Sequence, residues 1–316
     1  MHRFLLFLSV LWLAAFPAGV NAQHRTPACR LPVVCTLPAA VNETSGLVFW
    51  RNSLWTHNDS GGLPVIYRID TLSGKVLQRI TVKNAQNHDW EDIAQDSAYL
   101  YVGDMGNNSG NRKNLCIYKI KKSDIPLSGD AGVMAEKIAF SYPDYRGPVK
   151  NRKSNNFDGE ALMAAGDSLY LFSKDWQDQR SRLYALPKVP GSWKARLVSQ
   201  CNVHGLITGA DRNPVTGWVA LSGYTRGSWI PFVILLNEYH GHDFFSGNCK
   251  RIRLKVKATQ VEGIAFAGSN RLYLSSEGRP PAFKQTLYHT TMNALEKAPA
   301  WISGKHKKHS RKKNRP

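Results

Sequence analysis

The sequence is short of acidic residues and lacks the compact motifs of the common hydrolases and zinc proteins. Its 316 residues include 23 Asp and Glu against 42 Lys and Arg, which gives a formal net charge of +19. It contains no Cys-x-x-Cys pair, no His-Glu-x-x-His and no Gly-x-Ser-x-Gly. These absences argue against a zinc ribbon, a dithiol redox centre, a zincin and a serine hydrolase with a nucleophile elbow.

Long apolar runs are also missing, apart from one at the N-terminus. His2 and Arg3 precede an apolar stretch from Phe4 to Phe16, and Val20-Asn21-Ala22 fits a signal-peptidase site. Residues 1–22 are therefore predicted to be a signal peptide, and the protein is expected in the periplasm or outside the cell. The alternative is an uncleaved anchor, although the run is too short for a comfortable membrane span.

The C-terminus has no apolar residue to bury. The run "KHKKHSRKKNRP" from Lys305 holds seven Lys or Arg. We expect residues 304–316 to be disordered and residues 23–303 to form the folded domain. The tail either adheres to anionic polymer or lipid headgroups, or simply keeps the chain soluble. A nucleic-acid partner is not expected, because export argues against it and no known nucleic-acid-binding motif is visible.

The five cysteines fit an exported protein, in which disulfides can form. Cys29 with Cys35 and Cys201 with Cys249 are the possible pairs. The odd count leaves one thiol over, most simply Cys116 inside an apolar strand.

A repeated pattern organises the rest of the chain. An apolar strand, a turn rich in Gly, Asn, Asp or Ser, and a second strand rich in Leu, Tyr and Val recur five times. The copies begin at Asn42, Asp89, Phe157, His204 and Gln260. A third strand follows each copy ("VIYRID", "LCIYKI", "SRLYALP", "PFVILLN", "TLYHTT"), and a fourth follows all but the last.

Four antiparallel strands repeated along a chain predict an all-β fold, a single β-propeller. Five blades are favoured. Six remain possible, because the interval from Glu91 to Glu160 is long, although its excess "YRGPVKNRKSNN" is typical of a loop. The segment "CRLPVVCTL" from Cys29 is expected to supply the missing fourth strand of the last blade and close the ring.

Polar residues recur at two points of the repeat. The start of the first strand carries Glu43, Glu91, Glu160 and Glu262, with Thr208 in the fourth copy. The end of the second strand carries Asp59, Asp104, Lys174, Tyr224 and Glu277. Both points of a hairpin lie on the same face of the disc, and innermost strands line the channel. We therefore expect these side chains to converge at one channel mouth.

Four carboxylates at one mouth would repel each other unless a cation lies between them. Ca²⁺, which takes six to eight oxygen ligands, suits such a set better than Mg²⁺. Glu43, Glu91, Glu160 and Glu262 are thus predicted metal ligands. The alternative is that each acid pairs with a neighbour such as Lys174 or Arg180, or caps a strand end.

The same mouth offers candidates for catalysis and binding. His57, Asp59 or Asp104 could act as general base, and Lys174 could stabilise developing negative charge. His57 could equally bond a turn carbonyl. The predicted binding residues are Asn58, Asn107, Asn108, Trp176, Tyr224 and Glu277. The aromatic rings of Trp55, Trp90, Trp176, Tyr224 and Trp229 suit stacking on sugars or peptides, or else pack between blades.

The repeat motifs also carry a resemblance. "LWTHNDSGG", "DWEDIA…LYVGDMGNN", "GEALM…LYLFSKDW" and "QVEGIAF…LYLSSEG" resemble an uncharacterised family of exported bacterial β-propellers, over roughly Val41 to Tyr288. More remotely, the chain is similar to calcium-dependent propeller hydrolases of the lactonase and phosphotriesterase type and to esterase-like phytases. That resemblance implies a Ca²⁺ site at the channel mouth.

The chain departs from those hydrolases in having five units rather than six, and glutamates in place of a mixture of Asn and acids. We therefore favour a non-catalytic propeller that binds a small molecule, a glycan or a cell-envelope protein at an acidic, cation-occupied mouth. The alternative function is Ca²⁺-dependent hydrolysis of a phosphoester or a lactone.

Overall fold

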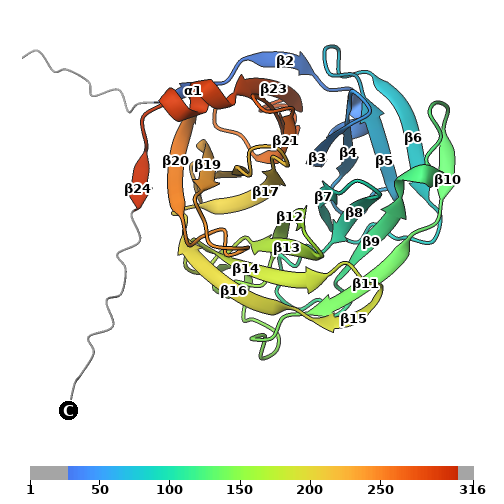
Figure 1. The fold of residues 1–316 in the computed structure, drawn as a ribbon, viewed down its shortest axis with the longest axis horizontal. Helices are drawn as coiled ribbons and strands as arrows, with labels where there is room; N and C mark the ends of the chain where they lie inside the picture. Colours follow the sequence, from blue (N-terminus) through green and yellow to red (C-terminus); the bar gives the residue numbers. More distant parts are fainter. Residues whose placement is uncertain (1–27, 305–316) are drawn as a thin grey trace, which may run out of the picture.

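The computed structural model describes residues 28–304, which form five small sheets arranged in a ring (Figure 1). The predicted signal peptide and the basic tail from Lys305 lie outside the described residues, whereas Gly304 belongs to a strand. Within residues 28–304, no helix is both long and apolar enough to cross a membrane.

Each sheet is one blade with four successive strands running outward from the channel, and four blades are continuous in sequence. Blade 1 is β3 (Thr44–Trp50), β4 (Ser53–Asn58), β5 (Val65–Ile69) and β6 (Val76–Val82). Blade 2 is β7 (Trp90–Gln95), β8 (Tyr99–Asp104), β9 (Cys116–Lys121) and β11 (Glu136–Ser141). Blade 3 is β12 (Gly159–Ala165), β13 (Ser168–Ser173), β14 (Arg180–Pro187) and β16 (Arg196–Asn202). Blade 4 is β17 (Leu206–Arg212), β18 (Val219–Tyr224), β19 (Pro231–Asn237) and β20 (Asn248–Lys255).

Blade 5 joins the two ends of the described chain. Its strands are β21 (Val261–Ala267), β22 (Arg271–Ser276), β23 (Thr286–Thr291) and β2 (Val33–Thr36). The N-terminal β2 pairs with β23 in antiparallel fashion, side by side at the top of Figure 1. The predictions of five blades and of closure by the segment from Cys29 are therefore confirmed.

Short additional strands cover three of the outer edges. β10 (Ala131–Val133) leaves blade 2 and pairs parallel with β6 of blade 1, and β15 (Gly191–Lys194) leaves blade 3 and pairs parallel with β11 of blade 2. Blade 4 gains β1 (Cys29–Arg30) and β24 (Ile302–Gly304), both against β20. These strands satisfy edge groups that would otherwise face solvent, and they tie neighbouring blades together.

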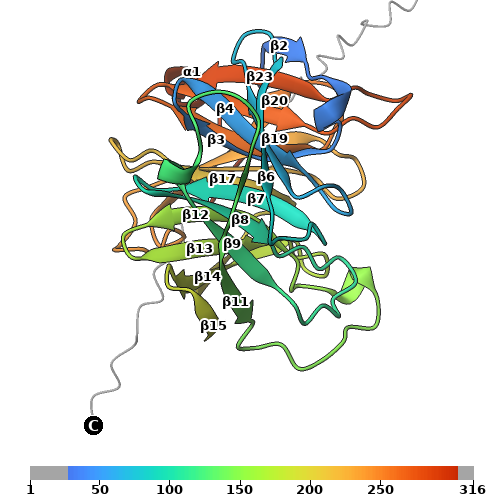
Figure 2. The ribbon, with the colours of Figure 1, turned by 90° about the vertical axis from the view of Figure 1, so that its right-hand side faces the viewer.

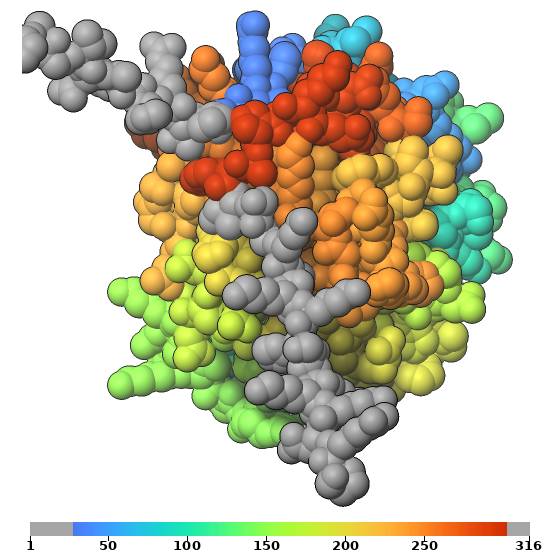
Figure 3. Space-filling model, turned by 60° about the vertical axis from the view of Figure 1, so that its left-hand side comes forward, coloured from blue at the N-terminus to red at the C-terminus, as the bar shows by residue number. Residues whose placement is uncertain are grey.

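The few helical segments lie outside the blades. Helix α1 (Met292–Lys297) buries Met292 and Leu295, and the red residues that include it lie over orange residues at the rim of the disc (Figure 3). Three 3₁₀ turns occur at η1 (Ala39–Val41), η2 (Lys122–Asp124) and η3 (Arg152–Ser154). The η3 turn sits in the long segment between β11 and β12, which projects from one face of the disc (Figure 2). That segment is the loop predicted from "YRGPVKNRKSNN".

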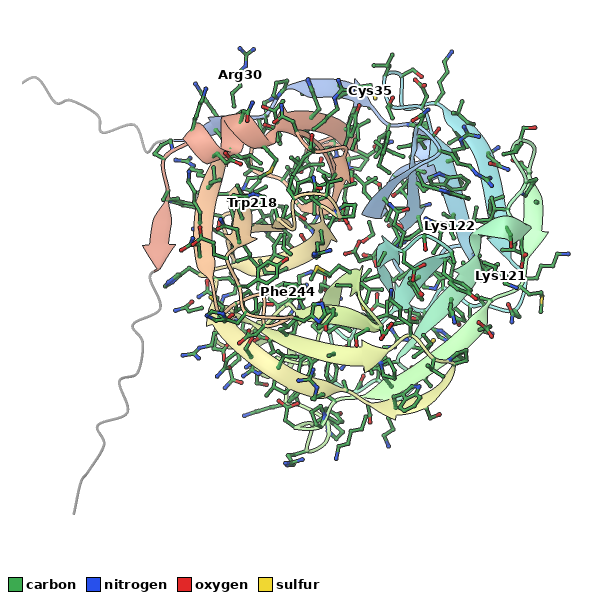
Figure 4. The ribbon with its side chains drawn as sticks, viewed as in Figure 1. Arg30, Cys35, Lys121, Lys122, Trp218 and Phe244 are labelled. Atoms are coloured by element: carbon green, nitrogen blue, oxygen red, sulfur yellow. The ribbon has the colours of Figure 1, made fainter. Side chains whose placement is uncertain are left out.

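The hydrophobic core is divided into five clusters, one between each pair of neighbouring blades. Between blades 3 and 4, for example, Phe244 stacks edge-on against Tyr170 and Tyr239, with ring centroids 5.0 and 4.8 Å apart (Figure 4). Trp55 and Trp90 are fully buried between blades 1 and 2. For those two residues, the structure therefore favours packing between blades over ligand stacking.

The buried carboxyl group of Asp92 connects the inner strands across the channel. Its Oδ2 accepts the backbone N–H groups of Leu162 in blade 3 and Ala210 in blade 4, at 2.8 and 3.1 Å. Its Oδ1 lies so close to Gly46 of blade 1 that a Cβ at position 46 would collide with it. Asp92 is 0% exposed. A single side chain thus holds four inner strands together and fills the middle of the channel.

The cysteines are distributed over four blades, and residues 28–304 contain no disulfide. Cys29 pairs with blade 4 through β1, whereas Cys35 lies on β2 at the outer edge of blade 5 (Figure 4), so the pairing of these two is not formed. Cys201 and Cys249 lie on the facing outer strands of blades 3 and 4, and an interaction with the Cys201 thiol lowers the pKa of Cys249. Their cross-linking stays a prediction. Cys116 is buried in β9, as expected.

Replacing Asp92 by alanine should destabilise the propeller strongly. The change leaves the N–H groups of Leu162 and Ala210 buried without an acceptor, and each such group costs about 1–3 kcal/mol. We expect Asp92→Ala to lower the free energy of unfolding in urea by about 2–5 kcal/mol. The matched control is Asp167→Ala in an exposed turn, which should change it by less than about 0.5 kcal/mol. An Asp92→Ala protein as stable as that control would show that the channel contact contributes little.

Candidate functional site

A β-bulge near the start of each inner strand positions the recurring polar residues. The bulged residue is Glu91 in blade 2, Glu160 in blade 3, Thr208 in blade 4 and Glu262 in blade 5. A bulge re-aims a side chain locally, and here it does so at the same level of every inner strand. The exposed fractions of Glu91, Glu160 and Glu262 are only 4%, 1% and 3%. The structure thus brings these three predicted ligands to one level of the channel.

Glu43 does not share that position, because blade 1 has a two-residue bulge at Ser45 and Gly46. Glu43 lies two residues before this point, in an exposed turn. Ser45 takes the place of the glutamates, and its hydroxyl donates to the Glu91 carbonyl. Thr208 donates in the same way to the Val261 carbonyl. Three glutamates and two hydroxyls therefore occupy this level, and Glu43 lies nearby at the mouth, where its charge contributes to raising the pKa of Asp59.

The residue after each second strand forms a further layer of the mouth. The backbone N–H groups of Asp59, Lys174 and Glu277 donate to backbone carbonyls at 2.9, 2.7 and 3.2 Å. The acceptors are Glu43, Asp158 and Gln260, which stand shortly before the bulge of the same blade. Tyr224 ends β18 at the corresponding point and is 2% exposed. These four residues lie where the repeat placed them.

In blade 2 the corresponding position belongs to Met105 rather than Asp104. The Met105 N–H donates to the Asp89 carbonyl at 3.2 Å. Asp104, one residue earlier, pairs with Arg112 at 2.7 Å and with His88 at 3.0 Å. Its carboxylate is therefore engaged by Arg112 and His88 and is not part of the cluster at the mouth.

Two acids that the sequence reasoning left out complete the cluster. Asp89 and Asp158 each stand two residues before a bulged glutamate, in the pattern Asp-x-Glu. They create two groups with carboxylate oxygens within 4.8 Å of one another: Asp59, Asp89 and Glu91, and Glu91, Asp158 and Glu160. The repeated Asp-x-Glu spacing was the signal that could have identified them.

In the second group, Glu160 and Asp158 already interact with donors from the protein. The Lys174 ammonium lies 2.9 Å from Glu160 Oε1. Asp158 accepts the Asn107 N–H at 2.6 Å and the Trp176 indole N–H at 2.8 Å. The predicted alternative, in which an acid pairs with Lys174, thus holds for Glu160.

In the first group, the one donor is the Ser60 N–H, which donates to Asp59 Oδ1 at 2.5 Å within the described residues. Glu91 Oε1 is buried and has no hydrogen-bond partner within residues 28–304. Asp59 and Asp89 are half-buried and so keep access to solvent. Gly106 forms one wall, where a Cβ would collide with Glu91 Oε1 and Asp89 Oδ2. Two oxygens bound to one Ca²⁺ can lie no more than about 5 Å apart, given ligand distances near 2.4 Å. The carboxylate oxygens of the first group therefore lie within the span that one Ca²⁺ can bridge.

The electrostatics of the mouth are dominated by carboxyl groups. Burial, reinforced by the neighbouring acids, raises the pKa of Asp59 to about 6 and that of Asp89 to about 7. Burial and Glu160 raise the pKa of Glu91 well above its usual value. Lys174 is the one ammonium group within this cluster of carboxyl groups. The carboxyl groups are those of Asp59, Asp89, Glu91, Asp158, Glu160, Glu262 and Glu277. Burial alone would lower the pKa of Lys174, but Glu160 and other anionic groups raise it well above the ordinary value.

The other predicted residues are placed around this cluster. His57 is 0% exposed, lies edge-on to Trp90 with ring centroids 5.6 Å apart, and contacts the Asn58 carbonyl through Nδ1 at 3.0 Å. Burial lowers the pKa of His57 to about 4, so the ring is neutral. The Asn58 amide donates to the Ala40 carbonyl at 2.9 Å. Asn108 Oδ1 is buried without a partner in the described chain.

Two aromatic residues flank the mouth with arginines stacked on them. Arg152 lies 3.6 Å from the centroid of the Trp176 ring, and Arg279 lies 4.9 Å from that of Trp229. Arg226 donates to the Trp176 carbonyl. All three arginines are exposed, and none forms an ion pair with an acid of residues 28–304. An acidic interior is thus bordered by an arginine-bearing rim.

The sequence matches no family model, and no curated protein matches it significantly. Solved structures do resemble the fold. An exo-β-1,3-galactanase from Phanerochaete chrysosporium with galactose aligns with a TM-score of 0.52 and 10% identity over 87% of this chain and 68% of that one. A PQQ-bound aldose sugar dehydrogenase from Streptomyces coelicolor aligns at 0.46 and 13%, over 83% of this chain and 98% of that one.

The galactanase shares the propeller fold with this chain. At 10% identity the likeness extends to the fold alone. The expected resemblance to lactonases and phytases therefore stays an expectation, and the site must be interpreted from its own residues.

The metal-free protein should be most stable when these carboxyl groups are protonated. The pKa values of Asp89 and Glu262 are both raised to about 7 on folding, first by burial. An acid with a raised pKa stabilises the folded state at low pH, and this contribution is lost as pH rises from the unfolded value near 4 to the folded value near 7. We expect wild type in EDTA to lose more stability between pH 4 and pH 7 than Asp89→Asn/Glu262→Gln does. Urea unfolding of both proteins measures this, and parallel pH profiles would contradict it.

Proposed function

We propose that this protein is an exported β-propeller that holds Ca²⁺ between Asp59, Asp89 and Glu91 and binds a ligand at that channel mouth without catalysis. The observation that carries the proposal is Glu91 Oε1, an acceptor that is buried, lacks a hydrogen-bond partner in the described chain and faces two more carboxylates. A buried carboxylate without a partner is costly, and a hard cation would compensate it.

The distribution of donors supports the proposed position of the ion. Lys174 already neutralises Glu160, and both oxygens of Asp158 are hydrogen-bonded. The remaining oxygens of Asp59, Asp89 and Glu91 would form one side of the coordination shell. Because Asp59 and Asp89 are half-buried, the other side faces solvent, where water or ligand oxygens can complete the six to eight positions of Ca²⁺.

The charge of the rim indicates the class of ligand. Arg152 and Arg226 leave guanidinium groups exposed beside the acidic interior, and Trp176 adds an aromatic edge. Carboxylate or sulfate groups suit the arginines, and hydroxyl or carboxylate oxygens suit the ion. We therefore favour an acidic glycan over a protein partner. The basic tail from Lys305 would add non-specific attraction to the same polyanion.

A second candidate function is Ca²⁺-dependent hydrolysis of a phosphoester or lactone. The raised pKa of Asp89, about 7, would suit a general base or acid next to the ion. Against this, His57 is fully buried and Lys174 is committed to Glu160. The neutral, inaccessible ring and the engaged ammonium support binding rather than catalysis.

Calcium should stabilise the wild-type protein and not a variant lacking two ligands. At a Ca²⁺ concentration about 100 times Kd, linkage adds about 2.7 kcal/mol, or roughly 5–10 °C in Tm for a domain of this size. The test is thermal unfolding of the chain from Gln23 in EDTA and in Ca²⁺ or Mg²⁺, for wild type and Asp89→Asn/Glu91→Gln.

The matched control carries the same two substitutions at exposed acids, Asp130→Asn with Glu136→Gln. The side chains of Asp130 and Glu136 are 60% and 56% exposed. The control should respond to Ca²⁺ as wild type does. A wild type without a Ca²⁺ response, or an equal response from the ligand variant, would overturn the cation site.

Binding and hydrolysis are separated by a second experiment. We expect the Ca²⁺-loaded protein to retain acidic polysaccharides and to lose them on addition of EDTA or in Arg152→Gln/Arg226→Gln. It should not release product from p-nitrophenyl phosphoesters or from lactones above the rate without protein. EDTA-sensitive turnover that is lost in Asp89→Asn would support the hydrolase instead.

A further inference from the structure

A cavity lies at the mouth of the channel opposite the acidic cluster. It has a volume of about 560 Å³ and is lined by residues of all five blades, at the ends of the inner strands and the turns that follow them. Small-molecule sites have volumes of about 300–1,000 Å³. Asp92 and its partners fill the channel between this cavity and the acidic mouth. The far cavity is therefore a separate compartment.

One wall of the far cavity is apolar. Phe49 and Phe266 contribute aromatic rings from two neighbouring blades, and Phe266 is only 6% exposed. Val215 also lines the cavity and is 79% exposed. An apolar ligand body could bury this valine together with the two rings, which supplies a hydrophobic driving force.

The acids that line the far cavity are already satisfied. Asp96 accepts from Lys188 and from the Tyr101 hydroxyl, both at 2.8 Å, and from two backbone N–H groups. Asp211 accepts the N–H groups of Phe266 at 2.7 Å and Arg212 at 2.8 Å. Neither carboxylate is left to recruit a ligand cation.

Arg212 is the cation without an acidic counterpart. Its Nε donates to the Tyr239 hydroxyl at 3.2 Å, and no carboxylate within residues 28–304 lies at ion-pair distance from it. Lys188, although paired with Asp96, has further ammonium donors. The far cavity thus combines an apolar wall with a lining arginine whose guanidinium has no carboxylate partner among residues 28–304.

We propose that the far cavity binds a small organic anion, a carboxylate or sulfonate carried on an aromatic or branched apolar body. The anionic group pairs with the Arg212 guanidinium through charge-assisted hydrogen bonds, and the body packs against Phe49 and Phe266. This binding does not require the cation at the acidic mouth.

The proposal is tested with two fluorescent probes that differ mainly in charge, 8-anilino-1-naphthalenesulfonate and the uncharged N-phenyl-1-naphthylamine. We expect wild type to bind one sulfonate per chain, with the same Kd in EDTA and in Ca²⁺. Arg212→Gln should weaken the sulfonate at least about tenfold and leave the uncharged probe within about twofold, because only the charge pairing is lost. Ser97→Trp, a filling substitution in an exposed lining turn, should weaken both probes.

The matched control is Arg196→Gln, which removes an exposed arginine on the outer strand β16 and should change neither affinity. Equal sulfonate affinity in wild type and Arg212→Gln would overturn the anion assignment. Unchanged binding of both probes in Ser97→Trp would overturn the cavity as the site. Neither outcome depends on Ca²⁺, so failure of the anion site can be distinguished from failure of the proposed function. Thermal unfolding of each variant verifies that it is folded.

Discussion

The carboxyl group of Asp92 is the interaction on which the arrangement of the channel depends. It accepts backbone N–H groups from blades 3 and 4 and packs against Gly46 of blade 1. Burial raises its pKa well above the ordinary value, although three N–H donors oppose that shift. The hydrogen bonds fix the inner strands relative to one another. They also divide the channel, so that the acidic mouth and the far cavity can serve different chemistry.

Most of the fold followed from the repeat. Apolar inner strands, turn residues and third strands recur at regular positions, and each hairpin can be recognised locally. Closure by β2 followed from the missing fourth strand of blade 5. The edge strands β10 and β15 could not be predicted, because each is three or four residues long and is paired only through contact with a neighbouring blade. No pattern within such a segment encodes its partner.

The site residues could be predicted in blades where a one-residue bulge preserves the spacing of the repeat. The prediction failed in blade 1, where the bulge is different. Glu91, Glu160 and Glu262 lie at equivalent positions, but the two-residue bulge of blade 1 displaces Glu43. The residue of blade 2 that faces the mouth is Met105, and Asp104 stands one residue earlier. Because neighbouring residues of a strand point to opposite faces of the sheet, this difference of one residue turns the Asp104 side chain away from the mouth. Asp89 and Asp158 were missed because they precede the strands. Their carboxylates enter the cluster only when hairpins from neighbouring blades meet.

The central claim is that one cation lies between Asp59, Asp89 and Glu91. The most direct measurement is anomalous diffraction from crystals of the protein grown with Mn²⁺ in place of Ca²⁺, recorded near the manganese edge. The account predicts one strong anomalous peak within about 2.5 Å of oxygens from all three carboxylates, and no peak next to Lys174. An anomalous map without a peak at this position, in crystals that contain the metal, would contradict it.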